Sequence, residues 1–241
     1  MCRHLGYLGP PEPVDALVTR GPHALYVQSW APRDMRRGGR INADGFGVAW
    51  WPAPGTVTRY RNAAPIWTDP AVTEVLGQIA SGAVVAAVRS ATVGMPVERA
   101  ACAPFTSDGW AFSLNGKVPG WREVIPDLAS GPLWDLECAT DSAALWMVLR
   151  RGLAAAPPAE ALANLVAAVL RRAPDSRLNL LLGDGETLWA TTVTHSLSAL
   201  VDDDCAVLSS EPYDDDPRWR PIPDHSLVTA RPGHLSITPL E

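Results

Sequence analysis

Residues 178–193 read LNLLLGDGETLWATTV, and this stretch decides how the chain builds its sheet. Two strand-forming arms flank Asp184-Gly185, a dipeptide that is typical of the tight turn between antiparallel strands. We therefore predict a β-hairpin here. Its two arms anchor the second half of an antiparallel sheet.

Helical spacing of apolar residues appears on the N-terminal side of this hairpin. It predicts helices over residues 69–82, 140–153 and 158–173. The third helix follows Pro157-Pro158, and the last two end in arginines, which suit the C-terminal end of a helix dipole.

Strand patterns lie on both sides of the two consecutive helices. Apolar or alternating runs predict strands over residues 2–8, 45–51, 83–90, 110–116, 177–183, 186–193, 198–201, 205–210 and 225–230. Strands before and after a helix pair, without a repeated strand-helix-strand order, indicate an α+β fold. No linker and no internal repeat divides the chain, so we expect a single domain over residues 1–241.

Composition narrows the class of protein. Of 241 residues, 47% are apolar, enough for a large core, and the formal net charge is −6. The arginines are scattered rather than clustered, which argues against a nucleic-acid partner. No run of 18 apolar residues and no signal peptide is recognisable, so we expect a cytoplasmic protein without a membrane partner. The acidic runs at residues 202–204 and 214–216 are interpreted as solvated loops.

The four cysteines show no metal-binding pattern. They contain no C-x-x-C pair, and the histidines lack metal-ligand spacing, so we expect neither a metal nor another cofactor. Cys102, Cys138 and Cys205 are interpreted as small buried hydrophobic residues.

Cys2 differs because only Met1 precedes it. Removal of Met1 leaves a thiol and a free α-amine on one residue. The pKa of such an amine is roughly 7.7 to 8.0, close enough to the thiol's value of roughly 8.5 to accept its proton. An amide-cleaving site of this kind also needs an oxyanion hole, and an amino-acid-like substrate needs an arginine and an acid.

Three places in the sequence offer these groups, and each also has an ordinary structural interpretation. Asn115-Gly116 offers an oxyanion hole, but the dipeptide also favours a turn. Arg89 ends an apolar strand, where arginines are commonly solvated. Asp141 offers an acid, but Thr140, Asp141 or Ser142 is also a suitable N-cap for the following helix.

Taken together, these residues resemble the class II glutamine amidotransferase domains of the N-terminal-nucleophile hydrolase superfamily. The matching blocks are Cys2 after Met1, NADGFG at 42–47, RSATVG at 89–94, NG at 115–116 and TDS at 140–142. They follow the family's order, and the family's forms of the last four are D-G/S-x-G, R-x-A-T-x-G, N-G and S/T-D-S/T. Weaker similarity continues in the hairpin and in Ser210-Glu211-Pro212.

The resemblance implies a four-layer αββα sandwich of two mainly antiparallel sheets. It also implies that Cys2 attacks the γ-carbonyl of a glutamyl group and that its own amine carries the proton. Asn115 and the Gly116 amide would form the oxyanion hole. The substrate's α-carboxylate would bind Arg89 and Thr92, and its α-ammonium would bind Asp141.

Some positions depart from the family's pattern. Ala87, Leu114 and Ala143 stand where many members have two histidines and an acid, and none of them carries an assigned role. Arg40 lies one place early relative to the family's R-G-x-D, so the role of residues 42–47 stays open.

A chain of this length has no room for a synthase domain that would use ammonia. The branch it most resembles is that of the stand-alone hydrolases of ergothioneine biosynthesis, which remove glutamate from γ-glutamyl-hercynylcysteine S-oxide. This implies a small-molecule γ-glutamyl substrate and no obligate protein partner. Alternatives are a glutaminase subunit that supplies ammonia to a separate synthase, a silent glutamine-sensing subunit, and a papain-like hydrolase built on Cys102 or Cys138.

The leaving group of that branch carries a quaternary ammonium, for which an aromatic face is a suitable receptor. Trp30 and Trp67 lie in or near loops and are our candidates for it. The remaining tryptophans we single out, Trp50, Trp51, Trp110 and Trp189, lie in strand patterns and are interpreted as packing residues.

Overall fold

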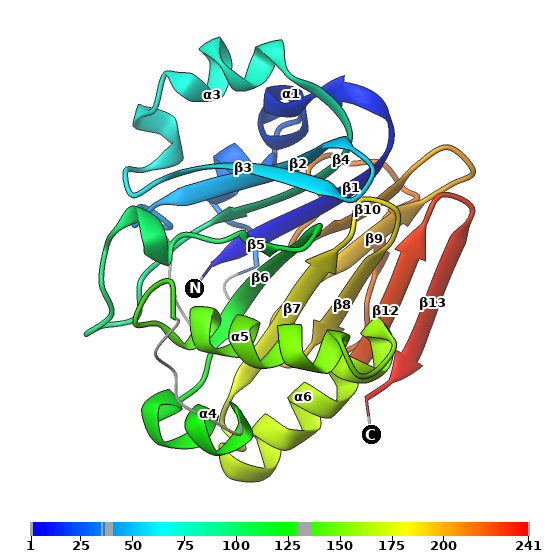
Figure 1. The fold of residues 1–241 in the computed structure, drawn as a ribbon. Helices are drawn as coiled ribbons and strands as arrows, with labels where there is room; N and C mark the ends of the chain where they lie inside the picture. Colours follow the sequence, from blue (N-terminus) through cyan, green and yellow to red (C-terminus); the bar gives the residue numbers. More distant parts are fainter. Residues whose placement is uncertain (1, 35, 37–40, 130–135, 241) are drawn as a thin grey trace.

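The chain folds into two facing β-sheets with helices on the outer side of each (Figure 1). The computed structural model describes residues 2–34, 36, 41–129 and 136–240. Its first sheet has the strand order β11-β9-β10-β1-β4-β2-β3, and its second has the order β13-β12-β8-β7-β6-β5. All pairings between the described strands are antiparallel.

The strands of the first sheet are β1 (Arg3–Pro13), β2 (Phe46–Ala53), β3 (Thr56–Asn62), β4 (Ala80–Val88), β9 (Ser198–Val201), β10 (Ala206–Ser209) and β11 (Arg220–Pro221). Those of the second are β5 (Phe105–Ser107), β6 (Trp110–Lys117), β7 (Arg177–Gly183), β8 (Leu188–Thr192), β12 (Ser226–Arg231) and β13 (His234–Pro239). The α-helices are α1 (Val14–Thr19), α2 (Leu25–Gln28), α3 (Ala71–Glu74), α4 (Trp121–Ala129), α5 (Asp141–Leu153) and α6 (Pro158–Arg172). Short 3₁₀ helices are η1 (Ile66–Thr68), η2 (Leu76–Gln78) and η3 (Arg99–Ala101).

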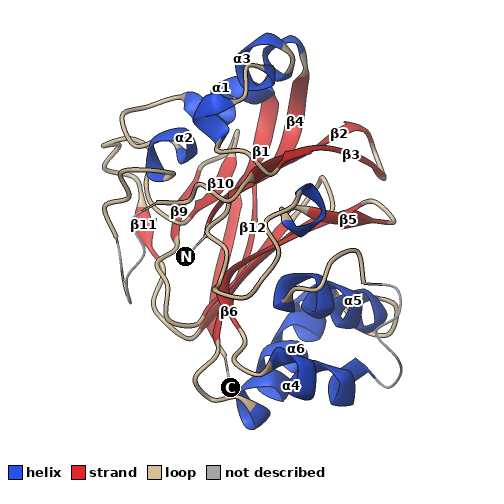
Figure 2. Cartoon of the chain, turned by 90° about the vertical axis from the view of Figure 1, so that its left-hand side faces the viewer, coloured by secondary structure: helices blue, strands red, loops and turns tan. Residues whose placement is uncertain are grey.

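Apolar side chains fill three successive layers. One cluster lies between the sheets and includes Leu8, Val85 and Leu181. A second lies between the first sheet and α1 to α3, and a third lies between the second sheet and α4 to α6. Figure 2 shows the two helical groups on opposite sides of the paired sheets. The fold is therefore the four-layer αββα arrangement, which confirms the fold class.

Side chains alternate between the two faces of a strand, so each sheet contributes residues to two apolar layers. In β6, Phe112 and Leu114 join the cluster under the helices, whereas Ala111 joins the cluster between the sheets. Residues two apart on a strand share a face. Ser113 and Asn115 therefore face the first sheet together with Ala111.

The hairpin and all nine predicted strands are present. β7 pairs with β8 through Gly183↔Leu188, and Gly185 in the turn has φ +96°. The helices over residues 140–153 and 158–173 are also confirmed, as α5 and α6. No helix in the described ranges has the length and apolar character needed to span a lipid bilayer.

The predicted helix over residues 69–82 is wrong. Only α3 and η2 are helical there, and β4 begins at Ala80. Gly77 and the β-branched residues of this stretch lower its helix propensity. Pairing of Ser81 with Glu12 of β1 takes the last residues into the first sheet.

Candidate active site

Cys2 and Arg89 lie next to each other at one edge of the first sheet. Arg3 of β1 is opposite Val88 of β4 in the antiparallel register, so Cys2 and Arg89 are the next residues outward on adjacent strands. The Cys2 side chain is half-buried, and its Sγ lies 3.9 Å from the Ser90 carbonyl oxygen. Met1 and Arg40 lie outside the described residues.

The Asp44-Gly45 segment holds Arg89 in place. The Arg89 amide donates to the Gly45 carbonyl at 2.8 Å, and the Asp44 amide donates to the Arg89 carbonyl at 2.9 Å. The Asp44 carboxylate accepts from the Ala91 amide at 2.7 Å, and the Arg89 guanidinium donates to the Asp44 carbonyl at 3.4 Å. The segment whose role the sequence left open therefore fixes the backbone and side chain of a buried arginine.

Gly45 is required at this position by both its backbone and its surroundings. Its φ is +113°, a backbone conformation that residues other than glycine rarely adopt. A Cβ here would overlap the Cys102 sulfur and lie 2.7 Å from the Asn62 carbonyl oxygen. Cys102 therefore lies directly behind the loop that supports Arg89.

Asn115 and Gly116 belong to strand β6 and do not form a turn. Asn115 faces the first sheet, is fully buried, and has no partner for either amide atom among the described residues. Gly116 lies opposite Leu178 of β7, and any Cβ at Gly116 would overlap the Arg177 carbonyl oxygen. The turn interpretation of this dipeptide is wrong. A buried amide without partners is unusual and needs another group to satisfy it.

Asp141 is the first residue of α5, and Thr140 is its N-cap. The Thr140 hydroxyl accepts from the Ala143 amide at 3.2 Å. The Asp141 carboxylate instead accepts from the Val118 amide at 2.9 Å and from the Ser142 amide at 2.8 Å. Burial raises the pKa of Asp141, while these hydrogen bonds and the Arg89 charge act in the opposite direction. The N-cap interpretation of Asp141 is wrong, and its carboxylate links α5 to the end of β6.

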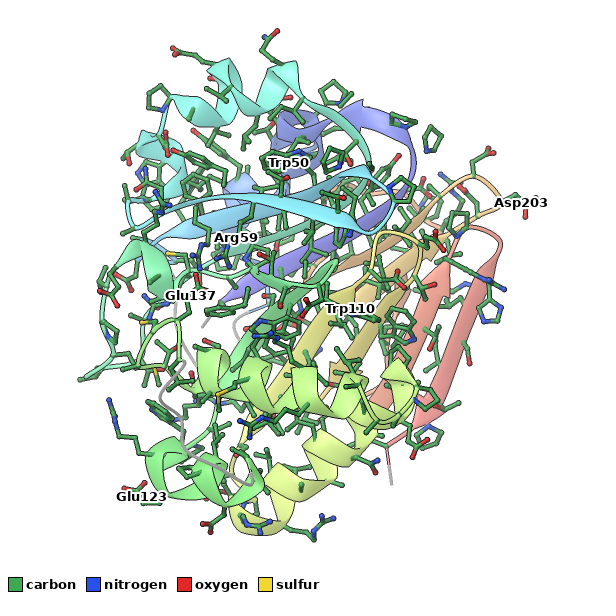
Figure 3. All side chains as sticks on the ribbon, in the orientation of Figure 1. Trp50, Arg59, Trp110, Glu123, Glu137 and Asp203 are labelled. Atoms are coloured by element: carbon green, nitrogen blue, oxygen red, sulfur yellow. The ribbon has the colours of Figure 1, made fainter. Side chains whose placement is uncertain are left out.

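Glu137 ties the segment before Asp141 to the edge strand β3. Its carboxylate lies 2.6 Å from the Arg59 guanidinium and also pairs with Arg61. Figure 3 labels Arg59 and Glu137 close to one another. These ion pairs anchor the segment that precedes α5 to β3.

Thr92 is the predicted site residue that the structure leaves apart. Its side chain is exposed in the loop after β4, and its carbonyl accepts from the Met95 amide at 2.9 Å. No hydrogen bond between the described residues joins it to Arg89.

A buried ion pair lies one residue from Cys2. Arg3 donates to Glu211 at 2.9 Å, and the side-chain exposures of the two residues are 1% and 4%. Glu211 also accepts from the Arg33 amide at 2.7 Å. The sequence pointed to Glu211 only through the weak similarity of Ser210-Glu211-Pro212, and it gave no sign of the partner.

Two buried histidines, His4 and His195, lie near the candidate site and were not expected from the sequence. His4 shares the face of β1 that Cys2 occupies, and neither His4 nor His195 has a ring hydrogen-bond partner among the described residues. Burial lowers the pKa of His4 to about 3 and that of His195 to about 4, and each is lowered further by the Arg3 charge. Both rings are therefore neutral near pH 7.

The surroundings of Cys102 and Cys138 disfavour the reactive thiolate form. Burial raises the pKa of Cys102 to about 11 and that of Cys138 to about 12. A Glu98 carboxylate oxygen accepts from the Cys138 thiol at 3.0 Å and favours its neutral form. These thiols stay protonated near neutral pH, which argues against a papain-like site on either one.

Comparison with known proteins finds similar chains and a matching family model. The family model for class-II glutamine amidotransferases matches residues 22–202. The chain is 42% identical to the gamma-glutamyl-hercynylcysteine sulfoxide hydrolase of Mycolicibacterium smegmatis over 241 residues, 100% of both chains.

Solved structures share the fold. A class-II glutamine aminotransferase domain protein from Silicibacter pomeroyi matches with a TM-score of 0.71 at 22% identity, and the match covers 100% of both chains. The glutamine phosphoribosylpyrophosphate amidotransferase of B. subtilis also matches with a TM-score of 0.71, at 13% identity, over 100% of this chain and 49% of that one. The family match and the full-length relative lead to one conclusion: this chain belongs to the class-II glutamine amidotransferases.

Proposed function

We propose that this protein hydrolyses the γ-glutamyl amide bond of a small-molecule conjugate, with Cys2 as its N-terminal nucleophile. The observation that carries the chemistry is the buried Asn115 amide, which has no partner among the described residues and lies on β6, a strand that contacts β1. An oxyanion hole needs such a donor, because its hydrogen bond is made only when charge develops on the substrate oxygen.

The reaction begins once Met1 is removed. The Cys2 thiol gives its proton to the α-amine of the same residue, and Sγ attacks the γ-carbonyl carbon. The oxyanion accepts hydrogen bonds from the Asn115 side chain and the Gly116 amide. The α-ammonium then gives its proton to the leaving nitrogen as the C–N bond breaks, which leaves a glutamyl thioester and a free amine.

Water completes the cycle. The α-amine of Cys2 takes a proton from the water as its oxygen attacks the thioester carbonyl. The C–S bond breaks, the sulfur regains a proton, and glutamate leaves. The amine therefore serves as base and acid in both halves of the reaction.

Recognition of the glutamyl group falls to the charged residues beside Cys2. Arg89 is buried and held by Asp44 and Gly45, which suits it to bind the substrate's α-carboxylate in a fixed geometry. Asp141 suits the α-ammonium, because a carboxylate that already accepts two amide hydrogen bonds can accept more. Thr92 would join Arg89 only if its loop closed over the substrate.

The leaving group we propose is hercynylcysteine sulfoxide, as named for the Mycolicibacterium relative. The match covers the whole of that relative, which supports a hydrolase that needs no synthase domain and no obligate protein partner. Trp30 and Trp67 form an edge-to-face pair 5.6 Å apart, and Trp30 is 41% exposed. Such a pair offers an aromatic face to the quaternary ammonium of this substrate.

Glutamate release from γ-glutamyl-hercynylcysteine sulfoxide and from glutamine, measured with wild-type protein and Cys2→Ala, tests this function. We expect the wild type to prefer the conjugate and the variant to release no glutamate from either substrate. Release of ammonia from glutamine at a higher kcat/KM than glutamate release from the conjugate would favour the ammonia-supplying alternative. Unchanged turnover by a folded Cys2→Ala variant would contradict the proposal.

A further inference from the structure

Lys117 is the only lysine of the chain, and it lies beside the oxyanion-hole candidate. It ends strand β6, two residues beyond Asn115. Because side chains alternate along a strand, Lys117 and Asn115 share the face that is turned to the first sheet, with Cα atoms about 7 Å apart. Lys117 therefore lies next to the proposed position of the scissile carbonyl, at the end of the strand.

The Lys117 ammonium has no ion-pair partner among the described residues. Its side chain is half-buried, yet it makes no ion pair and no side-chain hydrogen bond with the described residues. A half-buried lysine buries its aliphatic stem and keeps its ammonium in contact with solvent, where an anion can reach it. An unpaired ammonium at this position suits an anion that comes from outside the chain.

A cavity of about 390 Å³ opens at this end of the second sheet. Lys117 and Arg177 lie directly opposite each other in the β6–β7 register, and both line it. Ser176 lines it as well, is 2% exposed, and has no partner for its hydroxyl among the described residues. Asp175 is the one acid that lines the cavity in the described part of the chain, so its formal charge is +1.

The cavity adjoins β7, whereas the segment before Asp141 is anchored to β3. Glu137 anchors the segment before Asp141 to β3, and β3 lies over β5. In the second sheet β5 and β7 flank β6 on opposite sides. We place the γ-carbonyl of the substrate at Asn115 and its α-amino and α-carboxylate groups toward Asp141. The leaving group then lies on the other side of the carbonyl, toward β7 and this cavity.

We propose that Lys117, assisted by the Ser176 hydroxyl, binds the carboxylate of an amino-acid leaving group. This inference rests on the proposed function. In a γ-glutamyl-amino acid the carboxylate carbon is two bonds from the scissile nitrogen, whereas glutamine and simple γ-glutamyl amides have no such group. The ammonium thereby selects peptide-like γ-glutamyl conjugates over glutamine.

Two substrates that differ only in this carboxylate test the subsite: γ-glutamylalanine and γ-glutamylethylamide. The quantity measured is the ratio of their kcat/KM values, for the wild type, Lys117→Met, Lys117→Arg and Arg171→Gln. We expect Lys117→Met to lower the ratio about 10- to 100-fold, the range of a charge-assisted hydrogen bond. Lys117→Arg retains the charge and should restore most of the ratio.

Arg171→Gln is the matched control, because Arg171 is an exposed cation in the last turn of α6. Its ratio should equal that of the wild type. Both substrates are measured on the same preparation, so the ratio does not depend on how much of a variant is folded.

An unchanged ratio in Lys117→Met overturns the subsite and leaves the proposed function intact. Equal losses on both substrates also overturn it, because Lys117 would then act on the glutamyl part or on the fold. A wild type that hydrolyses neither substrate, nor the sulfoxide conjugate, contradicts the proposed function and the subsite together.

Discussion

Asn115 and Asn179 lie directly opposite each other on β6 and β7, and both are fully buried. Only the Asn179 side-chain amide has hydrogen-bond partners among the described residues. Asn179 donates to the His195 carbonyl at 2.8 Å and accepts from the amides of His195 and Val193 at 3.0 and 3.1 Å. Two identical side chains at matched positions therefore serve different purposes, one structural and one available to a ligand.

Replacing each asparagine by alanine should separate activity from stability. For Asn115→Ala we expect kcat to fall about 10²- to 10³-fold, as for other lost oxyanion donors. Its free energy of unfolding should stay within about 1 kcal/mol of the wild type, since no hydrogen bond to the described residues is lost. Steady-state kinetics and urea unfolding measure the two quantities.

Asn179→Ala is the matched control. It leaves the Val193 and His195 amides without partners, so we expect a loss of about 2 to 3 kcal/mol in unfolding free energy. If Asn115→Ala lost as much stability as Asn179→Ala and kept its kcat, Asn115 would be a structural residue.

Gly45→Ala should strongly destabilise the protein. The new Cβ meets backbone and sulfur atoms that cannot move freely, which we expect to cost about 3 kcal/mol in unfolding free energy. The loop that holds Arg89 should shift as well and raise KM. Thermal unfolding and steady-state kinetics check both effects.

Gly55→Ala is the control that separates the effect of steric overlap in Gly45→Ala from the effect of a positive φ. Gly55 also has a positive φ, of +70°, but nothing lies within 4 Å of its Cβ position. We expect it to lose only about 1 kcal/mol. Equal losses in the two variants would show that the contacts with Cys102 and Asn62 do not matter.

His4 should make stability depend on pH in the acidic range. The unfolded chain takes up a proton at this position below about pH 6.5, whereas burial holds the folded pKa at about 3. The stability that comes from keeping His4 neutral is therefore fully present above the unfolded pKa. It is lost progressively as the pH falls from about 6.5 toward 3. The loss is about 1.4 kcal/mol per pH unit across this window.

Urea unfolding between pH 7 and 4.5 tests this expectation. His4→Gln cannot take up the proton, so its unfolding free energy should fall less steeply on acidification than that of the wild type. His234→Gln removes an exposed histidine and should retain the wild-type slope. Equal slopes in the wild type and His4→Gln would show that His4 is not the group responsible.

Local patterns predicted much of the fold. Alternation and turn dipeptides located strands such as β7 and β8, because those signals lie within a few residues of one another. The same reasoning failed over residues 69–82, where an apolar spacing typical of a helix gives way to strand β4. Pairing with β1 decides that boundary, and the partner residues Glu12 and Pro13 lie about seventy residues earlier in the chain.

The candidate site was partly predictable for a related reason. Cys2, Arg89, Asn115 and Asp141 were recognised as an ordered set of motifs, and the structure then removed the turn and N-cap interpretations of the last two. The supporting groups were not predictable. Glu211 reaches Arg3, and His195 approaches His4, only through tertiary pairing across most of the chain length.

The central claim is that the mature chain begins with Cys2 and that its sulfur carries the glutamyl group. Intact-mass spectrometry tests it most directly, on the purified protein and on samples quenched with acid within milliseconds of mixing with γ-glutamyl substrate. We expect a mass that lacks methionine, and on quenching a second species heavier by one glutamyl group that is absent in Cys2→Ala. A protein that hydrolyses the substrate while Met1 is retained, or a glutamyl adduct that persists in Cys2→Ala, would contradict the account.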